Sequence, residues 1–332
     1  MQINDTLDNH YNIIRRLSNN INSQVYLVID INDNNHYIAK IKAQQNHFQH
    51  ELQMATMASG LNNPNIIHLN GHGVGTLNYH GNVTNNVNYM IFEYCPKRVL
   101  YEYARLGRFT ERQVKYFFKK ILLGVQALHV AGYCHRNLHL DNILLDQNYN
   151  PKINDFILTT QFLQNNQPIA LNDFVGARGY ISPQIHDHQP YNGEKADIFI
   201  LGAILIILVT GRPGFNGSGG DDPCYQFIRN GNIPQYWNHW DHFTGDHNNN
   251  YSNEFRDLYI KMVNFNENNR PTIAQILNHQ WFNEINNLDE QQLNQLELNV
   301  RNEFLARANQ VNMNQALIAD NNIDDDNDDN EP

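Results

Sequence analysis

The sequence predicts an α+β protein with a smaller β-rich part followed by a larger helical part. Residues 11–31 alternate apolar and polar side chains on both sides of a polar turn, which indicates a β-hairpin. Residues 109–130 repeat apolar side chains at helical spacing, with Thr110 placed to cap the helix and Gly132 placed to end it. At 332 residues the chain is long enough for two lobes with a substantial core.

The composition limits the classes of molecule that the chain is expected to bind. The formal net charge of −11 argues against nucleic acid or an anionic membrane as a general partner. Acids concentrate in residues 320–332, which predict a solvated, disordered acidic tail. Three cysteines lie far apart and show no metal-ligand spacing, and no secretory signal is evident, so we expect a reduced intracellular chain, cytoplasmic or nuclear. The longest apolar run, residues 198–209, is too short to span a bilayer and predicts a buried helix.

Further elements of the β-rich part follow the hairpin. Residues 36–42, His-Tyr-Ile-Ala-Lys-Ile-Lys, predict a strand that carries Lys40 and Lys42. Residues 47–60 have helical character, and residues 72–88 predict two strands joined by a loose hairpin. The run Tyr-Met-Ile-Phe-Glu-Tyr-Cys-Pro at residues 89–96 predicts the last strand of this part.

The centre of the chain carries two motifs at a characteristic spacing. Residues 135–142 read His-Arg-Asn-Leu-His-Leu-Asp-Asn, and Lys-Ile-Asn-Asp-Phe follows at residues 152–156. This stretch resembles the catalytic loop and metal-binding turn of eukaryotic protein kinases, where His-Arg-Asp-Leu-x-x-x-Asn precedes Asp-Phe-Gly. The Asn-Arg-Pro-Thr run at Arg270 and the later His-Gln-Trp-Phe extend the resemblance, which is closest to the calcium/calmodulin-dependent Ser/Thr type.

The resemblance implies a bilobal protein kinase fold over residues 11–283. Its small β-rich lobe would span residues 11–95 and its larger helical lobe residues 96–283. An extension, residues 1–10, would precede this domain. A helical tail, residues 284–319, would follow it and pack on the large lobe through one apolar face. The residues expected on that face are Leu288, Leu293, Leu296, Val300, Phe304 and Leu305.

The resemblance also implies a site for ATP and Mg²⁺. Lys40 would pair with the nucleotide phosphates, and Asn142 and Asp155 would hold the metal. The residues expected around the nucleotide are Val25, Ile38, Lys40, Glu93, Cys95, Asn142, Leu144 and Asp155, with Phe92 as gatekeeper. Glu93 and Cys95 would contact the adenine through backbone groups. Two departures leave nucleotide binding open. The three glycine positions of the phosphate-covering turn are Ser18, Asn20 and Ser23, and Ile38 replaces a small alanine beneath the adenine.

The acidic partner of Lys40 has two candidates in the following helix. Counting back from Pro64 without a gap places Met54 opposite Lys40. Glu51 lies one turn earlier and serves if the loop after the helix is longer than usual. The sequence slightly favours Glu51 and does not exclude Met54.

The residues that would handle the phosphate acceptor are altered. Asn137 stands where the catalytic aspartate is expected, His139 replaces a lysine and Ala177 replaces a threonine, while Ile157 replaces the glycine of the second motif. An amide accepts no proton at neutral pH, and losing a general base typically costs two to four orders of magnitude in rate.

Three functions are compatible with this pattern. The preferred interpretation is a pseudokinase that binds protein partners and retains some ATP and Mg²⁺ binding. The alternatives are a weakly or atypically active Ser/Thr kinase with a protein substrate, using His139 or Asp141 as the base, and a pure scaffold with a closed nucleotide pocket.

The switch region suggests an ordering contact that needs no phosphorylation. Asp173 occupies the phosphosite implied by the resemblance, and residues 161–177 contain no Ser, Thr or Tyr. We predict a permanent pair between Asp173 and Arg136. Gln184 replaces the acid that would pair with Arg270, so we expect another acid or a carbonyl group beside that guanidinium.

Overall fold

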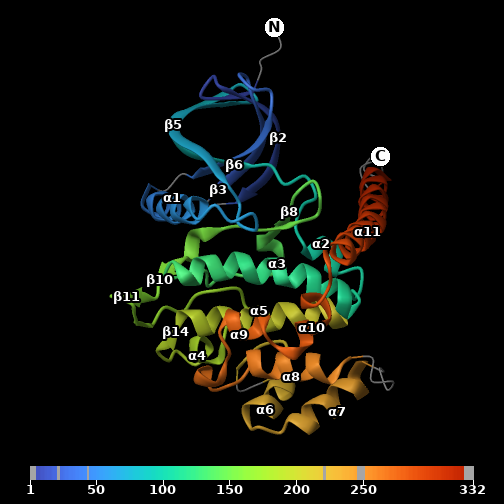
Figure 1. Cartoon of the computed structure of the whole chain (residues 1–332). Coiled ribbons are helices and arrows are strands. Elements are labelled where there is room, and N and C mark those ends of the chain that lie inside the picture. Colours follow the sequence, from blue (N-terminus) through green and yellow to red (C-terminus); the bar gives the residue numbers. More distant parts are fainter. Residues whose placement is uncertain (1–4, 21–22, 43–44, 220–221, 245–250, 325–332) are drawn as a thin grey trace, which may run out of the picture.

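The smaller lobe is a closed antiparallel β-barrel. The computed structural model describes residues 5–20, 23–42, 45–219, 222–244 and 251–324 (Figure 1). The barrel strands pair in the order β1-β2-β3-β4-β6-β5. Their bounds are β1 Thr6–Leu7, β2 Tyr11–Asn20, β3 Ser23–Asp30, β4 His36–Lys42, β5 Leu69–Tyr79 and β6 Asn82–Glu93. Helix α1, Gln45–Gly60, connects β4 to β5.

Strand β1 closes the barrel by pairing with both β2 and β5. Its Leu7 is fully buried in the barrel core, although residues 1–10 read as an extension of the domain from sequence. A two-residue strand carries too little periodicity to be recognised in a sequence. Residues 6–7 therefore belong structurally to the small lobe, and residues 1–4 lie outside the described part of the chain.

The interior of the barrel determines which way the lysines of β4 point. Ala39 and Ile41 are buried in the barrel core. Because successive side chains of a strand point to opposite faces, Lys40 and Lys42 both point away from that core. The period of two thus places two ammonium groups on one side of the same strand.

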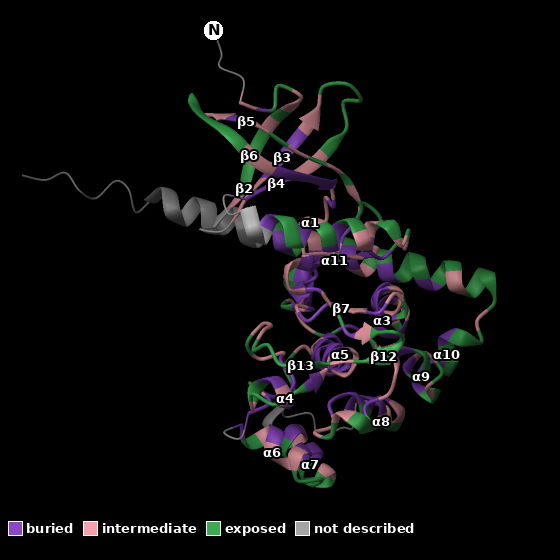
Figure 2. Ribbon diagram, turned by 90° about the vertical axis from the view of Figure 1, so that its left-hand side faces the viewer, coloured by how far each residue is buried: buried purple, intermediate pink, exposed green. Residues whose placement is uncertain are grey.

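The larger lobe is helical and is organised around α5, Gly193–Thr210, which is buried along most of its length (Figure 2). The predicted buried helix at residues 198–209 is confirmed, and it begins earlier than expected. Gly202 allows the segment after α8 to approach closely, because a Cβ atom there would lie 2.7 Å from Val263. The other helices of this lobe are α2 Tyr101–Ala104, α3 Glu111–Val130, α4 Pro183–His186, α6 Pro223–Arg229, α7 Ile233–Thr244, α8 Asn253–Met262, α9 Ile273–Leu277 and α10 Asn283–Asn286.

Helix α3 leads into the segment that carries the two motifs. The predicted cap is confirmed, since Thr110 and Gln113 form a reciprocal capping box, and Gly132 follows the helix with φ +86°.

The motif segment contains short elements: β7 Tyr133–Cys134, η1 Leu140–Asn142, β8 Ile143–Leu145, β9 Pro151–Ile153 and η2 Phe156–Leu158. Four more strands follow them: β10 Thr160–Gln161, β11 Leu163–Gln164, β12 Gln167–Pro168 and β13 Ala170–Leu171. Strand β13 pairs with β14, Tyr191–Asn192. Two further 3₁₀ turns, η3 Glu267–Asn269 and η4 Gln280–Phe282, follow in the described part of the lobe.

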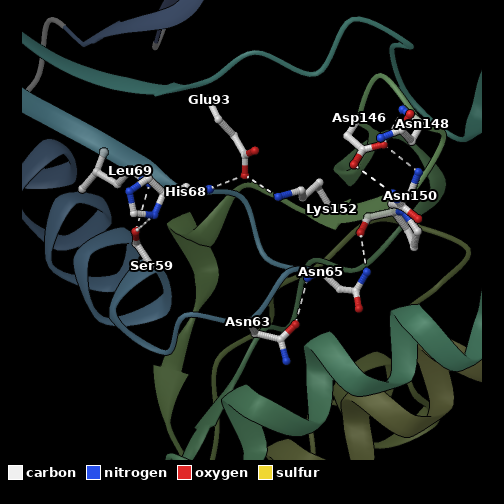
Figure 3. A network of polar contacts seen from close by, with 11 residues as sticks. Ser59, Asn63, Asn65, His68, Leu69, Glu93, Asp146, Asn148, Asn150 and Lys152 are labelled. Carbon is white, nitrogen blue, oxygen red and sulfur yellow. Dashed lines mark hydrogen bonds and ion pairs between the residues drawn. The ribbon is translucent and has the colours of Figure 1, made fainter.

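Polar contacts join the lobes behind the motif segment (Figure 3). Glu93, the last residue of β6, accepts hydrogen bonds from the backbone N–H of His68 at 2.7 Å and from Lys152 Nζ at 2.8 Å. The amide of Asn65 donates to the carbonyl of Pro151 at 3.0 Å. These contacts hold the strand pair β8–β9 against the small lobe and fix the relative position of the two lobes.

The chain ends in helix α11, Glu290–Asp324, which packs against α2 and α3 (Figure 1). Phe304 is buried among the rings of Tyr103, Phe109, Phe117 and Tyr149. Arg307 donates to the carbonyl group of Tyr103 in α2 and to those of Gly107 and Arg108 in the segment after it, at 2.7–2.9 Å. The side chain thereby joins α11 to the backbone of α2 and of the following segment.

The expected apolar face of the tail is correct only in part. Leu296, Val300 and Phe304 are buried, whereas Leu305 is 43% exposed. The helix also continues to Asp324, into residues expected to be disordered, and residues 325–332 lie outside the described part of the chain. Across the described ranges, no helix is both long and apolar enough to cross a lipid bilayer.

Truncation of Phe304 tests the docking of α11. We expect Phe304→Ala to lower the free energy of unfolding by about 3–5 kcal/mol, because it empties a site enclosed by four rings. The neighbouring Leu305→Ala should change it by less than about 0.5 kcal/mol, since that side chain is largely exposed. Chemical denaturation of the full chain measures both, and equal effects of the two variants would contradict the packing described.

Candidate functional site

A cavity of about 310 Å³ lies between the lobes, within the size range of small-molecule sites. Its walls come from the barrel strands β2–β4, from the end of β6 and from the motif segment. The residues lining it are Ser18, Ser23, Val25, Ile38, Lys40, Lys42, Ile67, Phe92, Glu93, Asn142, Leu144, Asn154, Asp155 and Ile157. Seven of the eight residues expected around a nucleotide line this one cavity, and Ile38 narrows it without filling it.

Cys95 is the exception among the expected residues. Its side chain is buried in the main hydrophobic core, which contains residues of both lobes, and Cys95 is not among the residues that line the cavity. Burial raises the pKa of its thiol to about 12, so the group is a neutral packing element. A contact between ligand and the backbone of Cys95 stays a proposal.

Lys40 pairs with Glu51, which answers the question that the sequence left open. Its ammonium donates to Glu51 Oε1 at 2.5 Å and to Asp155 Oδ1 at 3.0 Å. Met54 is instead buried in the hydrophobic core. Burial alone would lower the pKa of Lys40, but the charges of Asp155 and Glu51 outweigh burial and raise that pKa above its ordinary value.

Lys42 is a second cation at the same carboxylate. Its side chain is 3% exposed, and its ammonium forms an ion pair with the other oxygen of Glu51, which is itself 1% exposed. The sequence pattern assigns the phosphate contact to Lys40 and indicates no partner for Lys42. The signal was present in the spacing, because residues two apart in a strand point to the same side.

Asp155 is held by donors on both of its oxygens. Its backbone is left-handed, with φ +68°, which turns the side chain back toward Lys40. Oδ1 accepts from Lys40, and Oδ2 accepts from the Asn137 amide, Nδ2, at 2.9 Å. Burial would raise the pKa of Asp155, but the charge of Lys40 is stronger and lowers it. An aspartate at position 137 would offer no donor to Asp155 at neutral pH and would repel it.

The two expected metal ligands fit Mg²⁺ by donor type. Asn142 and Asp155 both line the cavity, and one carboxylate with one amide oxygen is a donor set that Mg²⁺ accepts when substrate phosphates complete its coordination. The amide nitrogen of Asn142 donates to the carbonyl of Asn137 at 2.9 Å. This hydrogen bond does not engage the side-chain oxygen of Asn142, which is the atom that would ligate a metal.

The loop that carries Asn137 keeps a firm backbone scaffold. Asp197, fully buried in α5, accepts hydrogen bonds from the backbone N–H groups of His135 and Arg136, each at 2.8 Å. His129 Nε2 contacts the same carboxylate at 2.8 Å. The loop is therefore shaped by groups other than the side chain at position 137.

His139, the other altered position of the loop, faces an acid. Its Nδ1 lies 3.3 Å from Asp141 Oδ2, and its ring centroid lies 6.1 Å from that of Tyr180. No ammonium group stands at this position to approach a transferring phosphate, as the lysine expected there would.

The predicted pair between Asp173 and Arg136 is present. Arg136 donates to Asp173 Oδ2 at 2.7 Å, to the carbonyl of Leu158 at 2.8 Å and to the hydroxyl of Tyr191 at 3.0 Å. Arg136 thus contacts Leu158 in η2, Asp173 after β13, and Tyr191 in β14. The contact between Arg136 and Asp173 therefore forms without phosphorylation.

The expectation for Arg270 is confirmed through carbonyl groups. Its guanidinium is buried and donates to Gln184 Oε1 at 2.7 Å, to the carbonyl of Asn264 at 2.8 Å and to that of Lys195 at 3.0 Å. Burial lowers the pKa of Arg270 to about 10. Among the described residues, neutral oxygens accept the hydrogen bonds of this buried guanidinium.

Replacing Asp173 tests the ordering contact. We expect Asp173→Ala to increase tryptic cleavage after Arg178 several-fold, because it releases one of the three acceptors of Arg136. The loss in unfolding free energy should stay below about 1 kcal/mol, since Asp173 is 63% exposed and screened by solvent. Asn172→Ala is the matched control on the neighbouring exposed residue. An unchanged cleavage rate in Asp173→Ala would contradict the assignment.

Comparison with known proteins agrees with this geometry. A family model described as protein kinase domain matches residues 11–282. The chain is 32% identical over 247 residues to NUAK family SNF1-like kinase 1 from Homo sapiens, covering 74% of this chain and 33% of that protein. It is 31% identical over 224 residues to Probable serine/threonine-protein kinase MARK-A from Dictyostelium discoideum, covering 67% of this chain and 19% of that protein.

A third relative is CBL-interacting serine/threonine-protein kinase 13 from Arabidopsis thaliana, 30% identical over 200 residues, with 58% of this chain and 36% of that protein covered. The matched regions thus span at most about a third of the length of these relatives. The family match covers both lobes and the cavity between them, which confirms the predicted bilobal α+β fold. The chain belongs to the eukaryotic protein kinase family.

Proposed function

We propose that this chain is a pseudokinase, a binding or regulatory module that holds ATP between its lobes and does not transfer the γ-phosphate. The observation that carries the proposal is the hydrogen bond from Asn137 Nδ2 to Asp155 Oδ2 at 2.9 Å. The residue at the position of the catalytic base acts as a donor to the metal-binding acid. It offers no carboxylate to an incoming hydroxyl group.

The chemistry of phosphoryl transfer explains why this substitution is decisive. The reaction asks the protein for positioning, for neutralisation of phosphate charge and for a carboxylate that accepts the proton of the acceptor hydroxyl. The first two requirements are supported by Lys40 and Asp155, and the third lacks its group. His139 and Ala177 remove two further side chains that would contact the phosphate and the base.

Nucleotide binding is supported by the cavity and its polar groups. Its volume of about 310 Å³ and its apolar walls, which include Val25 and Leu144, suit a purine ring. Lys40 is oriented by Glu51 toward the place of the phosphates, and Asn142 with Asp155 would hold Mg²⁺. The metal, when bound, supplies charge neutralisation between the phosphates.

The partner of such a module would be another protein. The segment after Asp155 is held by Arg136 and Asp173 without a modification, so the surface it forms is always available. The net charge of −11 disfavours nucleic acid and anionic membranes. Three free cysteines fit a reducing compartment, cytoplasm or nucleus.

A second function, a weakly active Ser/Thr kinase, is favoured by the contact between His139 Nδ1 and Asp141 Oδ2 at 3.3 Å. A carboxylate beside one ring nitrogen would orient the imidazole so that its other nitrogen accepts the hydroxyl proton of a protein substrate. This arrangement would replace the missing base by a histidine.

A phosphotransfer assay tests the main proposal. With radiolabelled ATP and a generic Ser/Thr protein substrate, the wild-type chain should incorporate no more label than Asp155→Ala. The triple variant Asn137→Asp, His139→Lys, Ala177→Thr should exceed both by at least about tenfold, because it restores a base and its neighbours. Wild-type incorporation well above Asp155→Ala would overturn the proposal.

The histidine alternative makes a separate prediction. If His139 is the base, any wild-type activity should fall at least about tenfold in His139→Ala, because the group that accepts the hydroxyl proton is removed. The exposed His188→Ala serves as control. Activity that survives His139→Ala would exclude this mechanism.

A further inference from the structure

A second buried lysine stands at the phosphate end of the cavity. We propose that this cavity binds the phosphates of a nucleoside triphosphate without a divalent cation, with Lys42 supplying the second positive charge. This inference rests on the proposed nucleotide binding and deepens it, because it names the group that takes over the role of the metal.

The placement of Lys42 carries the first step. Lys40 and Lys42 lie on the same side of β4, and both line the cavity. Lys42 is almost fully buried, and its ammonium contacts Glu51. A lysine at an ordinary solvated strand position would keep its charged end in water. This one holds its ammonium beside the group that orients Lys40.

The sum of charges carries the second step. Lys40, Glu51 and Asp155 alone have one positive and two negative charges, a net negative set that would repel phosphate until a cation binds. Lys42 adds a positive charge, so the four groups are neutral without a metal. The set therefore lacks the net negative charge that would repel phosphate before a cation binds.

The hydrogen bonds of Asp155 carry the third step. Its Oδ1 accepts from Lys40 and its Oδ2 accepts from Asn137, so each oxygen of the carboxylate that would ligate a metal already has one N–H donor. These donors partly compensate the charge of Asp155 without a metal.

The phosphate-covering turn supplies compatible donors. Ser18 and Ser23 line the cavity near the ends of β2 and β3, where glycine backbone would approach a nucleotide in relatives with the full motif. Their hydroxyl groups can donate to phosphate oxygens, which need such donors when no metal covers them.

The direct test is an isothermal calorimetric titration of the full chain with ATP, performed once in EDTA and once in Mg²⁺. We expect the two dissociation constants to agree within about threefold. ATP in EDTA should bind at least about tenfold more tightly than adenosine, which shows that the phosphates are recognised without metal.

Variants then assign the effect to Lys42. Lys42→Met should weaken binding of ATP in EDTA by at least about tenfold and leave adenosine binding within about twofold, while Lys42→Arg should stay near the wild type because it keeps the charge. Lys119→Met is the matched control, since that ammonium contacts Asn286 at the far side of the large lobe.

The outcomes are distinguishable. Binding of ATP that requires Mg²⁺ overturns this inference and leaves the proposed nucleotide site intact. No binding in either condition overturns both. ATP affinity in EDTA that equals that of adenosine overturns the inference with the wild-type chain alone, even if Lys42→Met does not fold.

Discussion

The ion pairs of Lys40 connect the three parts of the molecule on which the site depends. Its ammonium bridges Glu51 on α1 and Asp155 in the turn after β9, so strand β4, helix α1 and the large lobe meet at one side chain. Glu51 is buried and carries a second ammonium, that of Lys42. Removing a partner from such a buried set typically costs about 3–5 kcal/mol, because it leaves an uncompensated charge. The position of α1 is thus coupled to the shape of the cavity.

The site can lose its chemistry without losing this architecture. The carboxylate of Asp197 accepts hydrogen bonds from the backbone N–H groups of His135 and Arg136, and neither bond involves the side chain of Asn137. An exchange of aspartate for asparagine at position 137 therefore changes which group Asp155 contacts and leaves the loop in place. The Asn137 amide donates to Asp155, so the side chain at position 137 stabilises the neighbouring acid. The proposed loss of transfer and the proposed retention of a nucleotide both rest on this hydrogen bond.

Motif spacing allowed most cavity residues to be predicted, because the spacing of the catalytic loop, the metal turn and β4 determines where Lys40, Asn142 and Asp155 lie. The partner of Lys40 was harder to predict. The loop after α1 decides whether Glu51 or Met54 faces β4, and loop length is not encoded in helical periodicity. Strand β1 was missed because two residues show no pattern, and its role depends on distant β5.

Other failures also have physical causes. The ion pair of Lys42 was not predicted, because its partner Glu51 belongs to another element and the strand pattern does not indicate it. The expected backbone contact of Cys95 with a nucleotide stays a prediction, while its side chain packs into the main hydrophobic core, which no local pattern indicates. Leu305 seemed to continue the apolar face of α11, whereas Arg307 two residues later makes the buried contacts through its donors. Side chains that form contacts across elements are those that a single sequence predicts least well.

The central claim is that this kinase fold holds a nucleotide and leaves it intact. The most direct measurement incubates the full chain with Mg²⁺ and γ-labelled ATP, separates bound from free nucleotide, and identifies the bound species over several hours. The account predicts a stoichiometric complex in which the label is recovered as ATP. Accumulation of ADP with labelled phosphate or labelled protein, at a rate that Asp155→Ala abolishes, would contradict it.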